Sequence, residues 1–586
     1  MRAFPPSSKA AIAAFAVAAI AAYVPIVLFV FGIHTDYDQL YYKSYHFIFR
    51  EAPQLFSVAR PIAALLSNIT LLPISTLAGL RWYRCFSLFS FIVIGTQTIS
   101  ICTSYLRVRA SDAVAVACCL LLVPGLYYAA MSAAAWVPHI GAIWFGVCCY
   151  AILSRTNAQS IPFYVYARRF DWREGARFLL SYAGLRPVLA AAFLLQCGLY
   201  DYPTNALAVC IFPVIVALFS EAPLFYSALL CIRDLSFIAV NLFFYFISVK
   251  LLYFPLMKLV YPINVFPAVG PTSEYHFGLA SNFQEVWVRF LDVLRVSGNL
   301  WFLPQYRFWM VSLIAVAIAC LMAAGHRMLS KEVNCENGSP ILLGLREDDL
   351  VALLRVGVVA VAFIFAAFPV IASTGGRASY RTVAIPTVIA CVAFVFCIHT
   401  IGTLLGRFVS LESGRRVADA AVAAIALIAV ATTFYHVSIT VRLSQNEFAY
   451  ASGIVRDALR KHVTTLVVLD DRDTFFPEDV TEASDIHGHP TVPYELGCFS
   501  LNCFSSKPIY MEALLGMGRT TADLDIEIIR GKIARGVSCA DFAHRDNDAD
   551  VSADGPRSFA AMVAARGPVY CVNYAPIWRD LDFKPS

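Results

Sequence analysis

The chain has 586 residues, of which 59% are hydrophobic and 15% are charged, and its formal net charge is +5. Soluble globular proteins carry roughly 45–50% apolar and about 25% charged residues, so this composition excludes an ordinary soluble protein. The apolar residues gather in blocks of about 20, the length that crosses a bilayer core of about 30 Å. We therefore expect a polytopic, mainly α-helical membrane protein, and nothing in the charge balance points to nucleic-acid binding.

The first long apolar stretch, residues 11–33, contains no charged residue. It is too long for the core of a signal peptide, and no clear small-residue cleavage site precedes the acidic segment that follows. We interpret it as an uncleaved first membrane helix. Because basic residues remain in the cytoplasm, Arg2 and Lys9 predict a cytoplasmic N-terminus.

Short loops rich in Lys and Arg predict the remaining topology, and the cytoplasmic candidates are 107–109, 155–186, 325–350 and 407–416. These loops agree with one another if 34–83 is a long outer loop whose stretch 57–78 lies along the membrane surface. If that stretch crosses instead, the next several loops change sides. About eleven spans are expected. After the first span they are 84–106, 112–131, 137–154, 183–200, 204–220, 234–256, 307–324, 351–371, 382–405 and 419–440, with a short cytoplasmic surface helix at 221–233 and a second long outer loop at 257–306.

The tail is a different kind of sequence, polar and of mixed charge, and we expect two domains: a transmembrane domain over 1–440 and a periplasmic α/β domain over 441–586. A segment of about 140 residues is large enough to bury its own core. Thr465–Leu469 and Val569–Tyr574 predict buried strands, whereas Phe448–Lys461 and Ala522–Ala534 have helical spacing.

Four cysteines lie in this tail, and an even number in an extracytoplasmic domain suggests two disulfides. Three pairings are open, of which Cys498 with Cys503 is the most local. A zinc site that uses His487 and His489 is the alternative, although the spacing matches no common zinc pattern. The four candidates are Cys498, Cys503, Cys539 and Cys571.

Two carboxylates, Asp36 and Asp38, follow the first span directly. A carboxylate at this boundary can act as a general base on an incoming hydroxyl. The pair can also hold a divalent cation such as Mg²⁺ or Mn²⁺, which neutralises a phosphate leaving group. The alternative is structural, because Asp36 can cap a helix that begins near Tyr37.

The rest of this outer loop combines aromatic and basic residues close to the two acids. Aromatic faces with polar edges suit sugar rings, and Lys and Arg suit phosphate. The alternative for the tyrosines is a membrane-interface belt. The loop supplies Tyr41, Tyr42 and His46 as candidate substrate ligands, and Lys43 and Arg60 as candidate phosphate ligands.

A second cluster lies at 373–381, where Arg377 and Arg381 occupy an outer turn against the positive-inside trend. Binding a lipid-linked phosphate explains two outer arginines, since a guanidinium contacts phosphate with two donors and keeps its charge; snorkelling to lipid headgroups is the alternative. The long loop 257–306 adds Glu274 and His276 as weaker candidates. The turns Trp136–His139 and Tyr200–Pro203 can wall the same cavity, but ordinary turn chemistry is favoured there.

With these features the chain resembles the GT-C superfamily of integral-membrane glycosyltransferases. The resemblance is carried by Asp36 and Asp38 after the first span, the long first outer loop with Arg60-Pro61, the large outer loop midway and the outer C-terminal domain. Within that group it is similar to bacterial enzymes that decorate cell-surface polysaccharides, which have comparable Arg-Pro and Tyr-Pro pairs, here Arg60-Pro61 and Tyr202-Pro203.

The resemblance implies an inverting enzyme of the bacterial inner membrane, multi-pass and with a periplasmic C-terminal domain. Such an enzyme moves sugar from a polyprenyl-phosphate donor to a cell-envelope glycan or a lipid-linked acceptor. The role of base then falls on Asp36 or Asp38. A tyrosine separates the two acids here, and the second, metal-binding carboxylate of some members has no clear match.

Two other classes of function remain as alternatives. A polysaccharide polymerase or ligase also pairs outer arginines with a lipid phosphate, but it does not need acids directly after the first span. A transporter or flippase is expected to show internal repeats and polar residues at mid-membrane, and neither is plain here. The sequence contains no Walker A loop, GxGxxG or HExxH motif, so nucleotide chemistry has no support.

Overall fold

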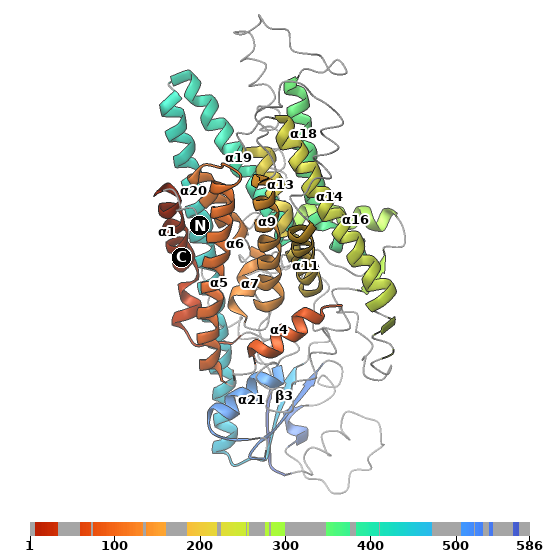
Figure 1. Cartoon of the computed structure of the whole chain (residues 1–586). Coiled ribbons are helices and arrows are strands. Elements are labelled where there is room, and N and C mark those ends of the chain that lie inside the picture. The colour runs from red at the N-terminus through yellow and green to blue at the C-terminus, as the bar shows by residue number, and fades with distance from the viewer. Residues whose placement is uncertain are drawn as a thin grey trace, which may run out of the picture.

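The computed structural model describes the chain in separate ranges, and these carry everything below. They are residues 6–32, 59–71, 74, 76–122, 124–132, 136–159, 185–219, 224–253, 255–256, 259, 276–279, 283–298, 347–374, 382–409, 411–470, 506–520, 522–530, 538–542 and 567–573. Most of these residues form helices that run along one bundle, with a small β-sheet at one end (Figure 1).

Among the described residues, seven helices are long and apolar enough to cross a membrane. The chain is therefore a multi-pass helical membrane protein, as its composition predicts. The expected span at 307–324 lies outside the described residues, as do residues 299–306 before it and 325–346 after it. The seven helices are α1 (Pro6–Leu28), α5 (Leu77–Ser104), α9 (Ala142–Gln159, continuing from Val137), α14 (Leu224–Ser248), α18 (Glu347–Ala372), α19 (Ala384–Val409) and α20 (Leu411–Arg460).

Three expected spans are shorter or interrupted. The expected span 112–131 is two helices, α6 (Ala110–Leu121) and α7 (Pro124–Met131). Pro124 has no N–H to donate, which breaks the helix. The carbonyls freed at the break accept from side chains, namely Leu121 from the Tyr23 hydroxyl at 2.8 Å and Leu122 from Thr433 at 3.5 Å, because lipid offers no alternative donor.

The next two expected spans, 183–200 and 204–220, form four helical pieces. They are α11 (Leu185–Asp201), α12 (Pro203–Ala206), the 3-10 turn η4 (Leu207–Cys210) and α13 (Ile211–Phe219). Gly146 of α9 lets this part of the chain approach closely, since a Cβ there would lie 2.4 Å from the carbonyl oxygen of Ala206. The end of α12 is therefore packed directly against α9.

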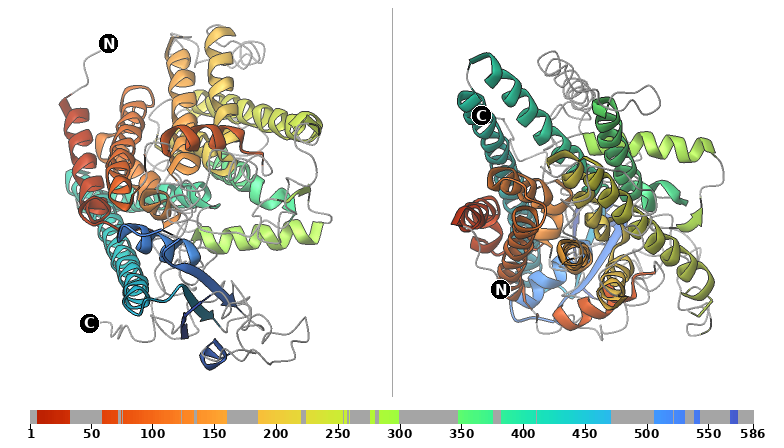
Figure 2. Two further views of the ribbon diagram at one scale, coloured as in Figure 1. Left: turned by 90° about the horizontal axis from the view of Figure 1, so that it is seen from below. Right: turned by 45° about the horizontal axis from the view of Figure 1, so that its top comes forward.

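The stretch expected to lie along the surface contains α4 (Pro61–Leu71), which has 11 residues. A helix of that length is about 16 Å long and cannot cross a bilayer. It lies across the direction of the bundle, at the end where the sheet lies (Figures 1 and 2). Both observations agree with the expectation for this stretch.

The expected cytoplasmic surface helix at 221–233 is wrong as a separate element, because residues from Leu224 onward are part of α14. Two charged side chains of α14, those of Arg233 and Asp234, are buried. Arg233 Nε lies 3.6 Å from Asp234 Oδ1, and the Tyr150 hydroxyl donates to Asp234 Oδ2 at 3.0 Å. These contacts allow both charged side chains to stay inside the bundle.

The C-terminal sheet has the order β4-β3-β5, with β3 (Thr465–Asp470) parallel to both β4 (Asp525–Arg530) and β5 (Val569–Asn573). The strands predicted at 465–469 and 569–574 are confirmed. The helix predicted at 522–534 is wrong over its first half. Ile526, Ile528 and Ile529 are β-branched, and pairing with β3 outweighs their helical spacing.

The core of this domain is shared with the bundle. Helix α21 (Ser506–Gly516) and the last turns of α20 cover one face of β3, and the 3-10 turn η8 (Cys539–Phe542) covers the other. Helix α20 continues without a break through residue 441, so the expected boundary falls inside a helix. The predicted helix 448–461 is the end of α20.

Candidate functional site

Of the site residues predicted from the sequence, Arg60, Cys539 and Cys571 are described in full. His276 is described by its backbone alone, as part of β1 (His276–Leu279). The others lie outside the described residues, and their roles stay predictions: Asp36, Asp38, Tyr41, Tyr42, Lys43, His46, Glu274, Arg377, Arg381, Cys498 and Cys503.

The Arg60-Pro61 and Tyr202-Pro203 dipeptides of the sequence meet through a contact between Arg60 and Tyr202. Its guanidinium carbon lies 4.2 Å from the centre of the Tyr202 ring, and its side chain is buried. Arg60 precedes α4 and Tyr202 precedes α12, and both helices begin with a proline, whose fixed φ suits the first helical position. An arginine on an aromatic face is stabilised by about 0.5–2 kcal/mol. The contact orients Arg60 at the end of the bundle.

Asp201, the last residue of α11, lies fully buried beside this pair. Its carboxylate faces Gly141, where a Cβ would lie 2.9 Å from Oδ2, so the close approach requires a glycine. The nearby charge that stabilises the carboxylate is that of Arg60. Neither carboxylate oxygen has a hydrogen-bond partner among the described residues. A buried carboxylate in this position needs a proton, a cation or a ligand hydroxyl.

Three more polar side chains complete what we call the Arg60 cluster. Asn205 donates from its amide nitrogen to Nδ1 of His139 at 2.9 Å, which leaves the proton of neutral His139 on Nε2. The His139 ring lies 4.2 Å from the Tyr202 ring. Within the described residues, Thr204 Oγ1 and Asn205 Oδ1 are buried without a partner. The cluster is Arg60, His139, Asp201, Tyr202, Thr204 and Asn205.

The sequence favoured ordinary turns at Trp136–His139 and Tyr200–Pro203, whereas the structure buries His139, Asp201 and Tyr202 in this cluster. The overlooked signal is Asp201 itself. An ionisable residue at the end of an apolar span, between two tyrosines and before a proline, is a candidate functional residue by its position alone.

The described parts of the two other regions singled out in the sequence also meet. Strand β1 pairs antiparallel with β2 (Ser373–Thr374), so that His276 lies opposite Thr374. Helix α16 (Phe283–Gly298) packs against the end of α18 and the start of α19, through Val293. Helix α12 packs against the same two helices. Helices α18 and α19 thus connect β1, β2 and α16 with the Arg60 cluster.

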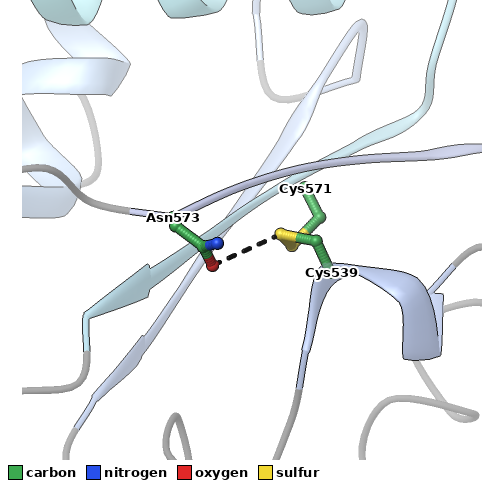
Figure 3. The surroundings of a disulfide bond; sticks show 3 residues. All are labelled: Cys539, Cys571 and Asn573. Carbon is green, nitrogen blue, oxygen red and sulfur yellow. Dashed lines mark hydrogen bonds between the residues drawn. A yellow bond between two sulfur atoms is a disulfide. The ribbon is translucent and has the colours of Figure 1, made fainter.

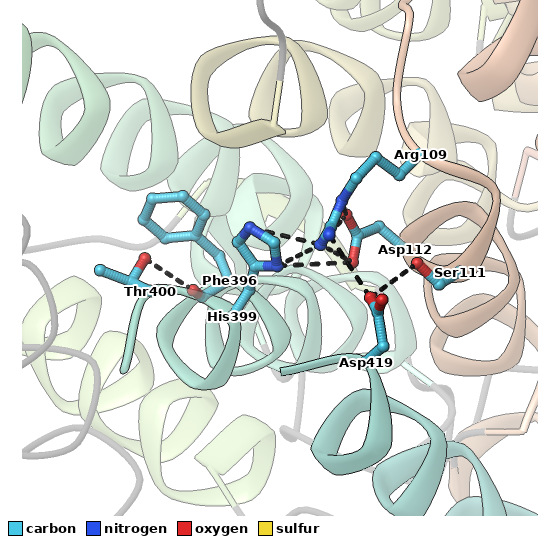
Figure 4. Close-up of polar contacts among 7 residues, drawn as sticks. All are labelled: Arg109, Ser111, Asp112, Phe396, His399, Thr400 and Asp419. Carbon is cyan, nitrogen blue, oxygen red and sulfur yellow. Dashed lines mark hydrogen bonds and ion pairs between the residues drawn. The ribbon is translucent and has the colours of Figure 1, made fainter. Parts of the chain in front are cut away.

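A second polar cluster joins α6, α19 and α20 (Figure 4). Arg109 lies 2.9 Å from Asp112 Oδ2 and 3.4 Å from Asp419 Oδ1, and it also contacts His399. Ser111 donates to Asp419 at 3.2 Å. Because every member has a partner within the group, the cluster serves to hold three helices together and needs no ligand.

The sheet domain carries a disulfide between Cys539 of η8 and Cys571 of β5 (Figure 3). The side-chain oxygen of Asn573 lies 3.6 Å from the Cys539 sulfur. Of the three pairings left open by the sequence, this bond agrees with the one that also joins Cys498 to Cys503.

No protein family and no curated protein matches the sequence. Among solved structures, the chain is similar to the crystal structure of ArnT from Cupriavidus metallidurans in the apo state, with 12% identity and a TM-score of 0.36. The match covers 88% of this chain and 89% of that one. A TM-score this low does not establish a shared fold.

Proposed function

We propose that the chain is an inverting, GT-C-type membrane glycosyltransferase that transfers a sugar from a polyprenyl-phosphate donor to a cell-envelope glycan or lipid-linked acceptor. The observation that carries the proposal is the Arg60 cluster, in which a buried guanidinium lies near a buried carboxylate. Membrane embedding suits such a donor, because a long apolar chain leaves the bilayer only at a high cost in free energy.

In the proposed reaction, Asp36 or Asp38 accepts the proton of the acceptor hydroxyl. The hydroxyl oxygen forms a bond to the anomeric carbon as the bond from that carbon to the phosphate oxygen breaks. The products are the inverted glycoside and the polyprenyl phosphate. Positive charge stabilises the leaving phosphate, and we assign that role to Arg60, Arg377 and Arg381.

A divalent cation is an alternative source of that charge. Asp201, Thr204 and Asn205 offer buried oxygens, which are the ligands that Mg²⁺ and Mn²⁺ prefer. Among the described residues, however, no group of three or more His, Cys, Asp or Glu side chains is placed to hold a metal ion. Activity in the presence and absence of EDTA, followed by addition of Mg²⁺ or Mn²⁺, tests this part of the proposal.

The direct test is a transfer assay with purified protein and a polyprenyl-phosphate sugar, in which the native chain is compared with Asp36→Asn and Asp38→Asn. We expect one variant to lose at least about 100-fold in turnover, since a general base contributes roughly 10²–10⁴-fold. Asp457→Asn, at an exposed position of α20, is the matched control. If both acid variants keep the turnover of the native protein, neither Asp36 nor Asp38 is the base. Movement of the intact donor across the membrane without a new glycosidic bond would favour a transporter.

The proposed orientation has its own test. A compartment reporter fused at residue 345 is expected to report the cytoplasm, and one fused after residue 586 the periplasm. The opposite result would place Arg60 on the cytoplasmic side of the membrane and remove the proposed donor-binding face.

A further inference from the structure

The end of α1 is held by arginines from α5. Arg84 is fully buried, donates from Nη1 to the Phe31 carbonyl at 2.8 Å, and lies over the Phe31 ring at 3.7 Å. Its Nε donates to the Met131 carbonyl at 2.7 Å. One turn earlier, Arg81 donates to the Val27 carbonyl at 2.6 Å. Carbonyls at a helix C-terminus lack partners within the helix, and cations there are favourable.

Helix α20 contributes a third bond, in which Gln445 donates to the Val30 carbonyl at 3.3 Å. Phe31 is five positions before Asp36 in the sequence. The chain that leads to the proposed base therefore starts from a backbone fixed by two helices.

The same two helices enter the core of the C-terminal domain. Leu77 and Leu80, in the first turn of α5, are buried together with Val455 of α20 and Leu514 of α21. On α5, the residues that face the domain core and those that bind α1 are thus within two turns of each other. A shift of the first turn of α5, where it contacts the C-terminal domain, is therefore transmitted to the end of α1 over less than about 12 Å of helix.

Glu512 of α21 fixes this junction. Its carboxyl group is buried and accepts a hydrogen bond from the backbone N–H of Leu77. The first turn of α5 is also capped by its own Thr76, which accepts from the Gly79 N–H at 3.1 Å. The C-terminal domain therefore supplies one of the caps of the helix that binds the end of α1.

We propose that the C-terminal domain positions the end of α1, with Glu512 holding the start of α5 and Arg84 transferring that position to Phe31. The identity of the base in this inference rests on the proposed function. The structural link from Glu512 through α5 to Phe31 does not depend on that function. Arg84 and Glu512 act as positioning residues, since a base must be held within hydrogen-bond reach of its proton.

Hydrogen–deuterium exchange of the full-length protein tests the link. We expect Glu512→Ala to raise amide exchange over residues 28–32 about 10-fold while β3 stays protected, because a local opening leaves the rest of the fold intact. Glu512→Gln keeps an acceptor for the Leu77 N–H and is expected to match the native protein, as is Asp457→Asn. Arg84→Gln is expected to raise exchange over the same residues.

Kinetics then separate positioning from a purely structural role. In Arg84→Gln and Glu512→Ala, turnover is expected to fall about 10-fold with the KM for the donor changed by less than about 2-fold. Unchanged exchange at 28–32 in Glu512→Ala, or a uniform rise across the protein, would overturn the proposed link. A native protein without transfer activity would instead remove the proposed function and leave the exchange result to decide the link.

Discussion

A carboxylate that is fully buried without a described hydrogen-bond partner, such as that of Asp201, opposes folding unless a proton or a cation neutralises it. Arg60 supplies part of the compensation, and Gly141 supplies the space. A group that opposes folding in this way is typical of binding and active sites, which often retain side chains that destabilise the fold.

Asp201→Asn is expected to lower transfer activity without lowering the midpoint of thermal unfolding, since the amide has nearly the same shape as the carboxylate but carries no charge. Paired activity and thermal-unfolding measurements check this. The exposed Asp457→Asn serves as the control. A variant that is less stable and fully active would assign Asp201 a structural role.

At the scale of elements, the polar clusters differ in what they hold. The Arg109 group joins three helices through mutual contacts, and its members differ in exposure: the Asp112 side chain is 3% exposed and that of Asp419 is 48% exposed. Removing one partner of a buried ion pair leaves an uncompensated charge, whereas an exposed pair contributes little.

We therefore expect Asp112→Asn to lower the free energy of unfolding by about 3 kcal/mol. Asp419→Asn, on the exposed side of the same guanidinium, is expected to cost less than about 1 kcal/mol. Thermal or denaturant unfolding in detergent measures both. Equal losses in the two variants would contradict the different burial of the two carboxylates.

Glu512 joins two elements and gives that junction a pH dependence. Burial raises the pKa of Glu512 from its ordinary value near 4.5 to about 7, and the hydrogen bond from Leu77 offsets only part of the rise. A folded-state pKa above the unfolded one means that the folded protein binds the extra proton. The stability that this proton contributes is fully present below about pH 4.5 and is lost as the pH rises through about 7.

Glu512→Gln is therefore expected to match the native protein near pH 5 and to be more stable near pH 8, by about 3 kcal/mol. Thermal unfolding of the two proteins across this pH range provides the measurement. A constant difference between the two curves would show that the carboxyl group does not titrate in this window.

At the scale of the whole molecule, the sheet domain is tied to the bundle by α20 and closed by a disulfide. The Cys539–Cys571 bond spans 32 positions of sequence and joins the turn η8 to the edge strand β5. Disulfides persist in oxidising compartments, so this bond agrees with the proposed periplasmic position.

The double variant Cys539→Ser, Cys571→Ser is expected to destabilise the sheet domain by about 3 kcal/mol, the typical effect of a loop of this length. Cys85→Ser, at a half-buried free cysteine of α5, is the control and is expected to change little. Thiol labelling before and after reduction provides a second measurement. Full labelling of Cys539 and Cys571 without reductant would show that the two cysteines do not form a disulfide.

The sequence predicted the elements well where the signal is local. Apolar length alone located α1, α5, α9, α18 and α19, and short apolar runs located β3 and β5. It failed at β4, because Ile526 and Ile528 fit either spacing and only pairing with β3 decides between them. It also failed at 221–233, where Arg233 is buried against Asp234 rather than exposed.

The candidate site divides in the same way. Local features singled out Arg60 and the tyrosine–proline turn, since an arginine in an outer segment and a proline after a span are visible in one dimension. Only the tertiary structure decided three contacts of the site. Arg60 lies on Tyr202, Asp201 is buried beside them, and β1 pairs with β2. Bilayer length and periodicity act on neighbours in the chain, whereas burial of a charge and stacking of two rings depend on how distant helices pack.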